Sequence, residues 1–124
     1  MLIIDTYLDK TENKGIGLFT TSMLRKGQVI SLNEEVFTKV ITVQDYLELV
    51  TTQREFFDTY AIFRDNDISL DLDNLRFMNH SDNPNVSFDR PDDIGYTLKD
   101  IMPDEELTCD YRELDGKINF INKE

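Results

Sequence analysis

The sequence has few of the residues that most metal and nucleophilic sites need. Its 124 residues include one cysteine, Cys109, one histidine, His80, and no tryptophan. A single cysteine rules out an intramolecular disulfide and a thiolate-rich zinc site, and one histidine is too few for an ordinary catalytic zinc site. No serine lies in a nucleophile-elbow sequence, so a Ser-His-Asp hydrolase is not indicated. The alternating carboxylates at 65–67 and 71–73 lack the glycine and the glutamate of a calcium loop, so we predict no metal.

Long hydrophobic runs are also absent from the sequence. No run approaches the roughly 18 apolar residues of a membrane span, and residues 1–5 lack the features of a signal peptide. We therefore expect a soluble intracellular protein that does not bind a membrane, and leave open whether it is cytoplasmic or nuclear. With 40% hydrophobic residues, 8 Phe and 5 Tyr, the chain can still bury a core.

Basic residues are scarce compared with acidic ones: 13 Lys and Arg stand against 25 Asp and Glu, which gives a formal charge of −12. Residues 1–64 carry −2, residues 65–115 carry −11 and residues 116–124 carry +1. A protein that follows a phosphate backbone needs a basic surface, so direct nucleic-acid binding is not expected. The acids of residues 65–115 either only solvate a small domain or attract a basic peptide or protein. Charge alone leaves both interpretations open.

Short apolar runs rich in β-branched residues alternate with turn residues along most of the chain, which predicts strands. The predicted strands cover residues 2–4, 28–32, 35–41, 68–72, 86–88, 96–98 and 107–111, and residues 15–19 form a turn that leads into a further strand. No linker or internal repeat separates them, and the length suits one domain over residues 1–124.

The middle of the chain changes to helical spacing over residues 43–62. Thr42 and Asp45 resemble a capping box, which marks the beginning of a helix. Two threonines interrupt the apolar pattern, so it predicts one interrupted helix or two short ones. The fold class predicted from these patterns is mostly β (α+β), with a central helical insert over about 42–64.

Two segments carry unusual residues between the predicted strands. Residues 74–85 contain four asparagines, the only histidine, a serine and a proline. They form either a cluster of Asx turns that satisfies its own backbone or a dense set of donors and acceptors for a ligand. Gly15 and Gly17 predict a tight turn, but no third glycine follows and no Gly-Lys-Ser/Thr is present. A dinucleotide fingerprint and a phosphate loop are therefore excluded.

Three motifs, taken in order, resemble those of the SET-domain protein lysine methyltransferases. Residues 76–81, Arg-Phe-Met-Asn-His-Ser, with Pro-Asn at 84–85, are similar to the family's Arg-Phe-x-Asn-His-Ser…Pro-Asn signature. Residues 14–19, Lys-Gly-Ile-Gly-Leu-Phe, resemble its early Gly-x-Gly element. Residues 104–111, Asp-Glu-Glu-Leu-Thr-Cys-Asp-Tyr, resemble its closing Glu-Leu-x-x-Asp-Tyr element. The motifs together span residues 14–111.

The resemblance implies the SET-domain fold, in which small curved β-sheets surround a C-terminal pseudoknot. The segment with Asp110-Tyr111 would thread under the loop near Asn79-His80. Threaded connections are rare, so no pattern in the sequence could have suggested this topology. The motif-bearing core would be residues 14–111, followed by a short tail over 114–124.

The resemblance also implies the cofactor S-adenosyl-L-methionine. By analogy with the family, the backbone of Gly15, Ile16 and Gly17 would lie against the methionyl part of the cofactor. Asn79 would hydrogen-bond the cofactor, and His80 would meet its adenine mainly through backbone atoms.

The family's catalytic tyrosine corresponds to Tyr111, which would orient the substrate lysine beside the methyl group. Cys109 stands where the family usually has an aromatic residue in the lysine channel, so the number of methyl groups added stays open. Phe120 is the candidate lid of that channel in the absence of a trailing zinc module. Glu106 and Asp110 are expected to be scaffold acids rather than bases.

The partner implied by the resemblance is a basic protein or peptide, such as a histone tail or another lysine-rich protein. A homodimer is possible if a second subunit completes the channel. The first alternative is a catalytically inactive SET-fold binding module for a cationic partner. The second alternative is an unrelated acidic β protein that sequesters a cationic partner and binds no cofactor.

Overall fold

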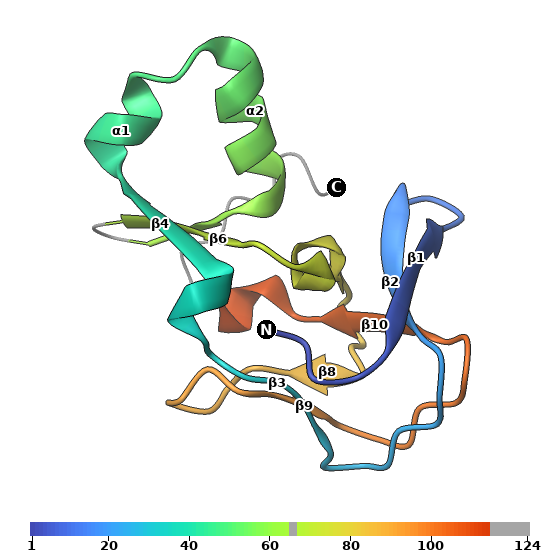
Figure 1. Ribbon diagram of the computed structural model, residues 1–124. Helices are drawn as coiled ribbons and strands as arrows, with labels where there is room; N and C mark the ends of the chain where they lie inside the picture. Colours follow the sequence, from blue (N-terminus) through green and yellow to red (C-terminus); the bar gives the residue numbers. More distant parts are fainter. Residues whose placement is uncertain (65–66, 115–124) are drawn as a thin grey trace.

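The computed structural model describes residues 1–64 and 67–114, which form three small β-sheets and two short α-helices (Figure 1). The first sheet has the strand order β1-β2-β10-β7. Its strands are β1 (Thr6–Lys10), β2 (Ile16–Thr20), β10 (Glu106–Cys109) and β7 (Asn79–His80).

Strand β10 lies between two strands that are far from it in the sequence. It pairs antiparallel with β2, where Leu107 lies opposite Leu18, and parallel with β7, where Cys109 lies opposite His80. Leu18 and Leu107 are both completely buried. The end of the described chain is thus inserted between earlier segments, which agrees with the pseudoknot that the sequence resemblance implied.

The second sheet, β3-β9-β8, closes the other side of the main core. It consists of β3 (Val29–Ser31), β9 (Gly95–Thr97) and β8 (Val86–Ser87). Apolar side chains from both sheets and from the loops between them meet in one cluster, as expected for apolar positions that alternate with polar ones. The buried members of this cluster are Leu18, Leu24, Ile30, Met78, Val86, Phe88, Ile101, Leu107, Cys109 and Tyr111.

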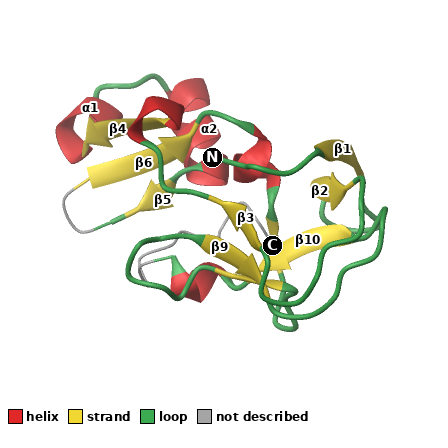
Figure 2. Ribbon diagram, turned by 60° about the horizontal axis from the view of Figure 1, so that its bottom comes forward, coloured by secondary structure: helices red, strands yellow, loops and turns green. Residues whose placement is uncertain are grey.

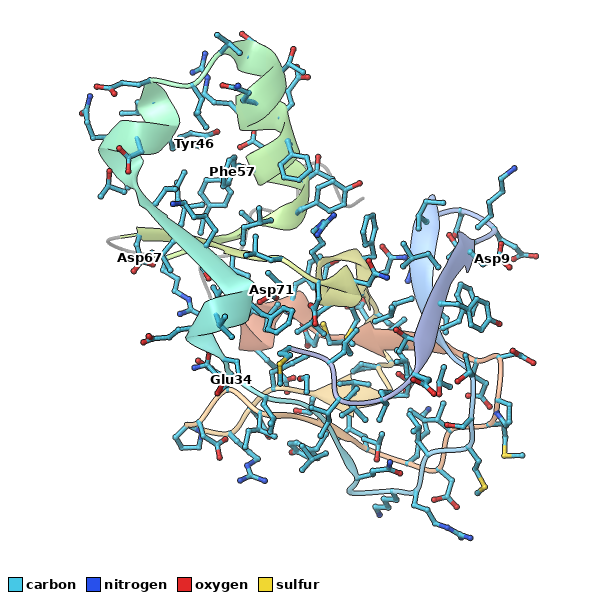
Figure 3. All side chains as sticks on the ribbon, viewed as in Figure 1. Asp9, Glu34, Tyr46, Phe57, Asp67 and Asp71 are labelled. Carbon is cyan, nitrogen blue, oxygen red and sulfur yellow. The ribbon has the colours of Figure 1, made fainter. Side chains whose placement is uncertain are left out.

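The third sheet carries the predicted helical insert and has its own small core. It has the order β4-β6-β5, and the two helices cover one of its faces (Figure 2). Its elements are β4 (Thr38–Thr42), α1 (Val43–Leu47), α2 (Thr51–Tyr60), β5 (Ile62–Phe63) and β6 (Asp67–Asp71). Tyr46 and Phe57 lie on the helix side of the sheet, where they pack against Ile68 and Leu70 (Figure 3).

Several predicted elements are confirmed, and two predictions are wrong. The capping box of Thr42 and Asp45 is present, and the helical segment is two short helices. The strand expected at residues 2–4 is wrong, because there only Leu2 forms an isolated bridge, with Ser31. The strand expected at 35–41 begins instead with a single 3₁₀ turn, η1 (Glu35–Phe37).

Strand β1 was not predicted at all. It is the edge strand of its sheet, pairing with β2 alone, and three of its five residues are exposed. An exposed edge strand needs no apolar alternation, which explains the missing signal. Two further 3₁₀ turns, η2 (Asn74–Phe77) and η3 (Tyr111–Glu113), flank β7 and β10. None of the helices in the described residues is long and apolar enough to cross a membrane.

Candidate active site

Tyr111 lies where β10 ends and η3 begins, and only 5% of its surface is exposed. Its hydroxyl donates a hydrogen bond to the carbonyl oxygen of Met78 at 2.6 Å. Its backbone N–H donates to Nδ1 of His80 at 3.1 Å. Residues 78–80 therefore hold the tyrosine at both its backbone and its hydroxyl.

The surroundings of Tyr111 keep its phenol protonated. Burial raises the pKa of Tyr111 far above its ordinary value, and the nearby Cys109 and Glu106 raise this pKa further. A phenol with a raised pKa cannot serve as a phenolate base at neutral pH. Because its proton goes to Met78, the Tyr111 oxygen has only its lone pairs to offer to another group.

A cavity of about 550 Å³ lies beside Tyr111, between the main core and the sheet of the insert. Thr38 lies opposite Asp71, and Val40 opposite Ser69, on the face of that sheet turned away from the helices. Figure 3 shows Asp71 at the end of β6 nearer the core. The cavity wall includes Thr38, Val40, Ser69 and Asp71 from the sheet, and Met78, Phe88, Cys109, Tyr111 and Leu114 from the core side.

Charged side chains of both signs surround the cavity, so its wall is close to neutral. Burial raises the pKa of the Asp71 carboxyl, and the N-terminal amine and Arg64 partly oppose this effect. Because acidic and basic groups are nearly balanced in the wall, the acidic excess of residues 65–115 does not concentrate in the cavity. The charged groups of the wall are those of Glu35, Asp71 and Asp93 on the acidic side and those of Lys39, Arg64, Arg76 and the N-terminal amine of Met1 on the basic side.

Asn79 connects the Gly-x-Gly turn to β10. Its side-chain nitrogen donates to the carbonyl oxygen of Ile16 at 3.1 Å and to a carboxylate oxygen of Glu106 at 2.9 Å. A Cβ atom on Gly17 would lie 2.6 Å from that same carboxylate oxygen and 2.7 Å from the methyl group of Thr11. Any side chain at position 17 would therefore have to displace Glu106 or Thr11.

Gly15 has a different role from Gly17. Its φ of +72° lies in the left-handed region, and no atom lies within 4 Å of the place where a Cβ would stand. Beside it, the Lys14 ammonium donates a hydrogen bond to the carbonyl oxygen of His80 at 2.5 Å. The turn thus presents an open backbone surface next to a positive charge.

Arg76, Asp110 and Glu106 each hydrogen-bond to groups of the protein itself. Nη1 of Arg76 donates to the carbonyl oxygens of Leu72 and Asp73 at 3.0 and 3.3 Å. Asp110 caps η3, and its hydrogen bonds with Arg112 lower the pKa of its carboxyl. Glu106, as described above, accepts a hydrogen bond from Asn79.

Comparison with known families decides what this arrangement is. The sequence matches the SET domain family over residues 15–112. The chain belongs to the SET-domain family. No curated protein sequence matches it.

Solved structures share this SET-domain fold. A Plasmodium falciparum protein described as a histone methyltransferase has 24% identity and a TM-score of 0.64, over 87% of this chain and 93% of its own. The Neurospora SET-domain protein DIM-5, a histone lysine methyltransferase, has 22% identity and a TM-score of 0.62. That match covers 89% of this chain and 53% of DIM-5, so this SET domain spans about half of the DIM-5 chain.

The predicted site residues of this SET domain fall into two neighbouring sets, which the hydrogen bond between Tyr111 and His80 connects. Tyr111 and Cys109 line the cavity, and Cys109 is buried. Phe120 lies outside the described residues. The residues predicted to bind the cofactor lie together at the turn and the adjoining strand: Gly15, Ile16, Gly17, Asn79 and His80.

Two functional neighbours of Tyr111 were not assigned a role from the sequence. The side-chain amide of Asn85 donates to the carbonyl oxygen of Glu106 at 2.8 Å and accepts from the N–H of Thr108 at 2.9 Å. These two hydrogen bonds hold the backbone of β10 in place. Glu113 accepts hydrogen bonds from the Ser87 hydroxyl at 3.0 Å, which anchors η3. The Pro-Asn pair of the motif was a signal for Asn85, whereas Glu113 carries no signal in the sequence.

Among residues 1–64 and 67–114, no three histidine, cysteine or acidic side chains gather closely enough to hold a metal ion.

Proposed function

We propose that this SET domain transfers a methyl group from S-adenosyl-L-methionine to the side-chain nitrogen of a lysine in a basic protein or peptide. The observation that carries the proposal is the placement of Tyr111, a buried and protonated phenol held at both ends beside a cavity. The two similar structures, both described as histone methyltransferases, support the same reaction class.

The residues around the Gly-x-Gly turn fit the cofactor in their chemistry. When bound, S-adenosylmethionine would supply a methyl carbon on a cationic sulfur, which a neutral amine can attack in line, with a neutral thioether as the leaving group. The Lys14 ammonium suits a carboxylate, and the carbonyl oxygens of Ile16 and His80 suit amino groups. The open space beside Gly15 lets a ligand approach the backbone closely. These groups would hold the two polar ends of the cofactor.

Tyr111 is the proposed catalytic residue, and its part is alignment rather than proton transfer. Its hydroxyl proton is directed to Met78, so its oxygen lone pairs are the groups that can accept a hydrogen bond from the amine. Holding reactants in line is worth several orders of magnitude in rate without any covalent chemistry by the protein. Apolar wall residues, among them Val40 and Phe88, favour the neutral amine over its ammonium form.

The charge of the domain favours a basic substrate at long range. The stretch 65–115 carries −11, while the cavity wall itself is close to neutral. Acidic surface charge raises the rate at which a cationic peptide meets the protein, and added salt screens this effect. We therefore infer that a histone tail or another lysine-rich segment is attracted by the surface and selected by the cavity.

A transfer assay with radiolabelled S-adenosylmethionine and a set of basic proteins, including histones, tests the proposal. It is paired with calorimetric titration of the cofactor. Label in lysine, identified by mass spectrometry, supports methyl transfer. Cofactor binding without transfer to any protein in the set would favour the binding module instead. If the folded protein binds no cofactor, the proposed function is wrong.

A further inference from the structure

We propose that the imidazole of His80 is a positioning residue for Tyr111, in addition to any contact that the His80 backbone makes with the cofactor. The inference rests on the proposed function, because it takes Tyr111 as the catalytic residue. Its basis is the hydrogen bond from the Tyr111 backbone N–H to Nδ1 of His80, at 3.1 Å.

The position of this hydrogen bond explains why a side chain is needed. The parallel ladder between β7 and β10 pairs Cys109 with His80, and it continues with a bond from the Ser81 N–H to the carbonyl of Cys109 at 2.9 Å. Tyr111 then starts η3, and the first N–H groups of a helical turn have no partner within it. Since Tyr111 is buried, its N–H needs an acceptor, and His80 supplies one.

The same contact sets the tautomer of the imidazole. A nitrogen that accepts a hydrogen bond carries no proton, so the ring proton of neutral His80 is on Nε2. Nε2 lies 3.0 Å from a carboxylate oxygen of Asp82, which accepts this proton in a hydrogen bond. One neutral tautomer thus satisfies both neighbours, whereas a doubly protonated ring would turn an N–H toward the N–H of Tyr111.

The charged groups around His80 are arranged in a short chain. Arg112 lies 3.2 Å from Asp82 and 2.8 Å from Asp110, and Asp110 lies 3.8 Å from Nδ1 of His80. Lys14 binds the carbonyl of His80. The side chains of Asp82 and Arg112 are 84% and 64% exposed, so their ion pair is weak and screened by salt.

Holding both ends of Tyr111 matters for transfer because the reaction depends on alignment. If the hydrogen bond at the backbone end is lost, the hydroxyl bond to Met78 remains, but the backbone of Tyr111 is less firmly held and the ring can shift along the cavity wall. A misplacement of about 1 Å is enough to lower a rate by about 100-fold. His80 therefore affects turnover more than it affects binding of the cofactor.

The first test is NMR of the full chain without cofactor. We expect the nitrogen shifts of His80 to show the tautomer protonated on Nε2 at neutral pH. We also expect the amide resonance of Tyr111 to shift as the ring of His80 takes up a proton. A tautomer protonated on Nδ1, or a Tyr111 amide that does not respond to this protonation, would overturn the proposal.

The second test compares His80→Asn with His80→Ala in the transfer assay. The side-chain oxygen of asparagine stands close to where Nδ1 was and accepts a hydrogen bond, but it does not titrate. We expect kcat of His80→Ala to fall about 100-fold, with kcat of His80→Asn at least about tenfold higher than that of the alanine variant. The KM for S-adenosylmethionine should be similar in the two variants, because both keep the backbone.

The dependence on pH separates positioning from a merely structural role. The rate of His80→Asn relative to wild type should rise as the pH falls, because only the wild type loses its acceptor on protonation. Protonation of the substrate lysine affects both proteins equally. Equal kcat for the asparagine and alanine variants would overturn the proposal. If wild type transfers no methyl group at all, the proposed function fails, and the NMR titration still decides whether His80 holds Tyr111.

Discussion

The side-chain nitrogen of Asn79 lies 2.9 Å from a carboxylate oxygen of Glu106, and this hydrogen bond ties β7 to β10. The second N–H of the same amide goes to the carbonyl of Ile16. Both donors of Asn79 are thus directed to protein atoms. A hydrogen bond to the cofactor would have to use the side-chain oxygen or the backbone of Asn79, which narrows the role implied by the sequence resemblance.

Replacing Asn79 by alanine should destabilise the domain and weaken cofactor binding. The substitution leaves the Ile16 carbonyl and the Glu106 carboxylate without this donor, at a cost of about 2–3 kcal/mol in the free energy of unfolding. Urea denaturation measures this cost, and calorimetry measures the affinity. Asn83→Ala is the control, since Asn83 is an exposed asparagine of the same loop and should change stability by less than about 0.5 kcal/mol. Equal effects of the two variants would contradict the role given to Asn79.

The variant Tyr111→Phe should retain the cofactor and lose most of the transfer activity. It removes the hydroxyl that donates to Met78, and the oxygen proposed to orient the amine. We expect kcat to fall by about 100-fold or more and the stability to fall by about 1 kcal/mol. The control is Tyr96→Phe, which removes an exposed hydroxyl that donates to Asp89 at 2.6 Å. Transfer that is unchanged in Tyr111→Phe would remove Tyr111 from the mechanism.

Gly17→Ala should be more harmful than Gly15→Ala. An added methyl group at Gly17 would meet Glu106 and Thr11, and overpacking of this kind costs about 1–3 kcal/mol. At Gly15 there is space, so the cost of about 1 kcal/mol comes only from the left-handed backbone. Adding Thr11→Ser to Gly17→Ala should restore part of the loss, because serine lacks the methyl group and keeps the hydroxyl bound to Gly15. No recovery in thermal denaturation would place the strain elsewhere.

Asp71→Asn should stabilise the domain at pH 7. Burial raises the pKa of Asp71 above its ordinary value of 3.8, so the folded state pays for its ionisation as the pH rises through that pKa. An uncharged asparagine avoids this cost. Its advantage over wild type should therefore shrink as the pH falls below the ordinary value, which urea denaturation at pH 7 and pH 3 would show.

Asp73 serves as the control for the Asp71→Asn prediction. Asp73 accepts hydrogen bonds from the N–H groups of Leu2 and Leu75 at 2.8 and 3.1 Å. Asp73→Asn should therefore destabilise the domain at pH 7, opposite in sign to Asp71→Asn. If both variants destabilise the protein equally at neutral pH, burial does not control the ionisation of Asp71.

Local elements of the fold could be predicted from the sequence, but its topology could not. The capping box at Thr42 and the alternation in Leu107 and Cys109 are signals of neighbouring residues. The pairing of Leu107 with Leu18 joins residues that no periodicity relates. Only the resemblance to the SET-domain family supplied that connection. The edge strand β1 was missed because its residues are mostly exposed.

The candidate site, like the fold, could be predicted only in part from the sequence. Tyr111, Asn79 and the glycines were identified because they lie in motifs. Several of their partners are backbone atoms, such as the carbonyl of Met78 for Tyr111, or depend on a tautomer, as at His80. Neither kind of contact can be predicted from the identities of the residues. The near-neutral charge of the cavity wall could not be predicted either, because the wall combines charged residues from several separate segments of the chain.

The insertion of β10 between β2 and β7 has a consequence for the way the protein is made. A ribosome releases residues 16–20 and 79–80 before residues 106–109. Until β10 is made, β2 and β7 each have an edge whose backbone groups lack their partner strand. Closing such long loops slows folding compared with local contacts. The residues proposed to bind the cofactor on β2 and β7 therefore emerge before Tyr111, and the proposed site forms only when β10 pairs with both strands.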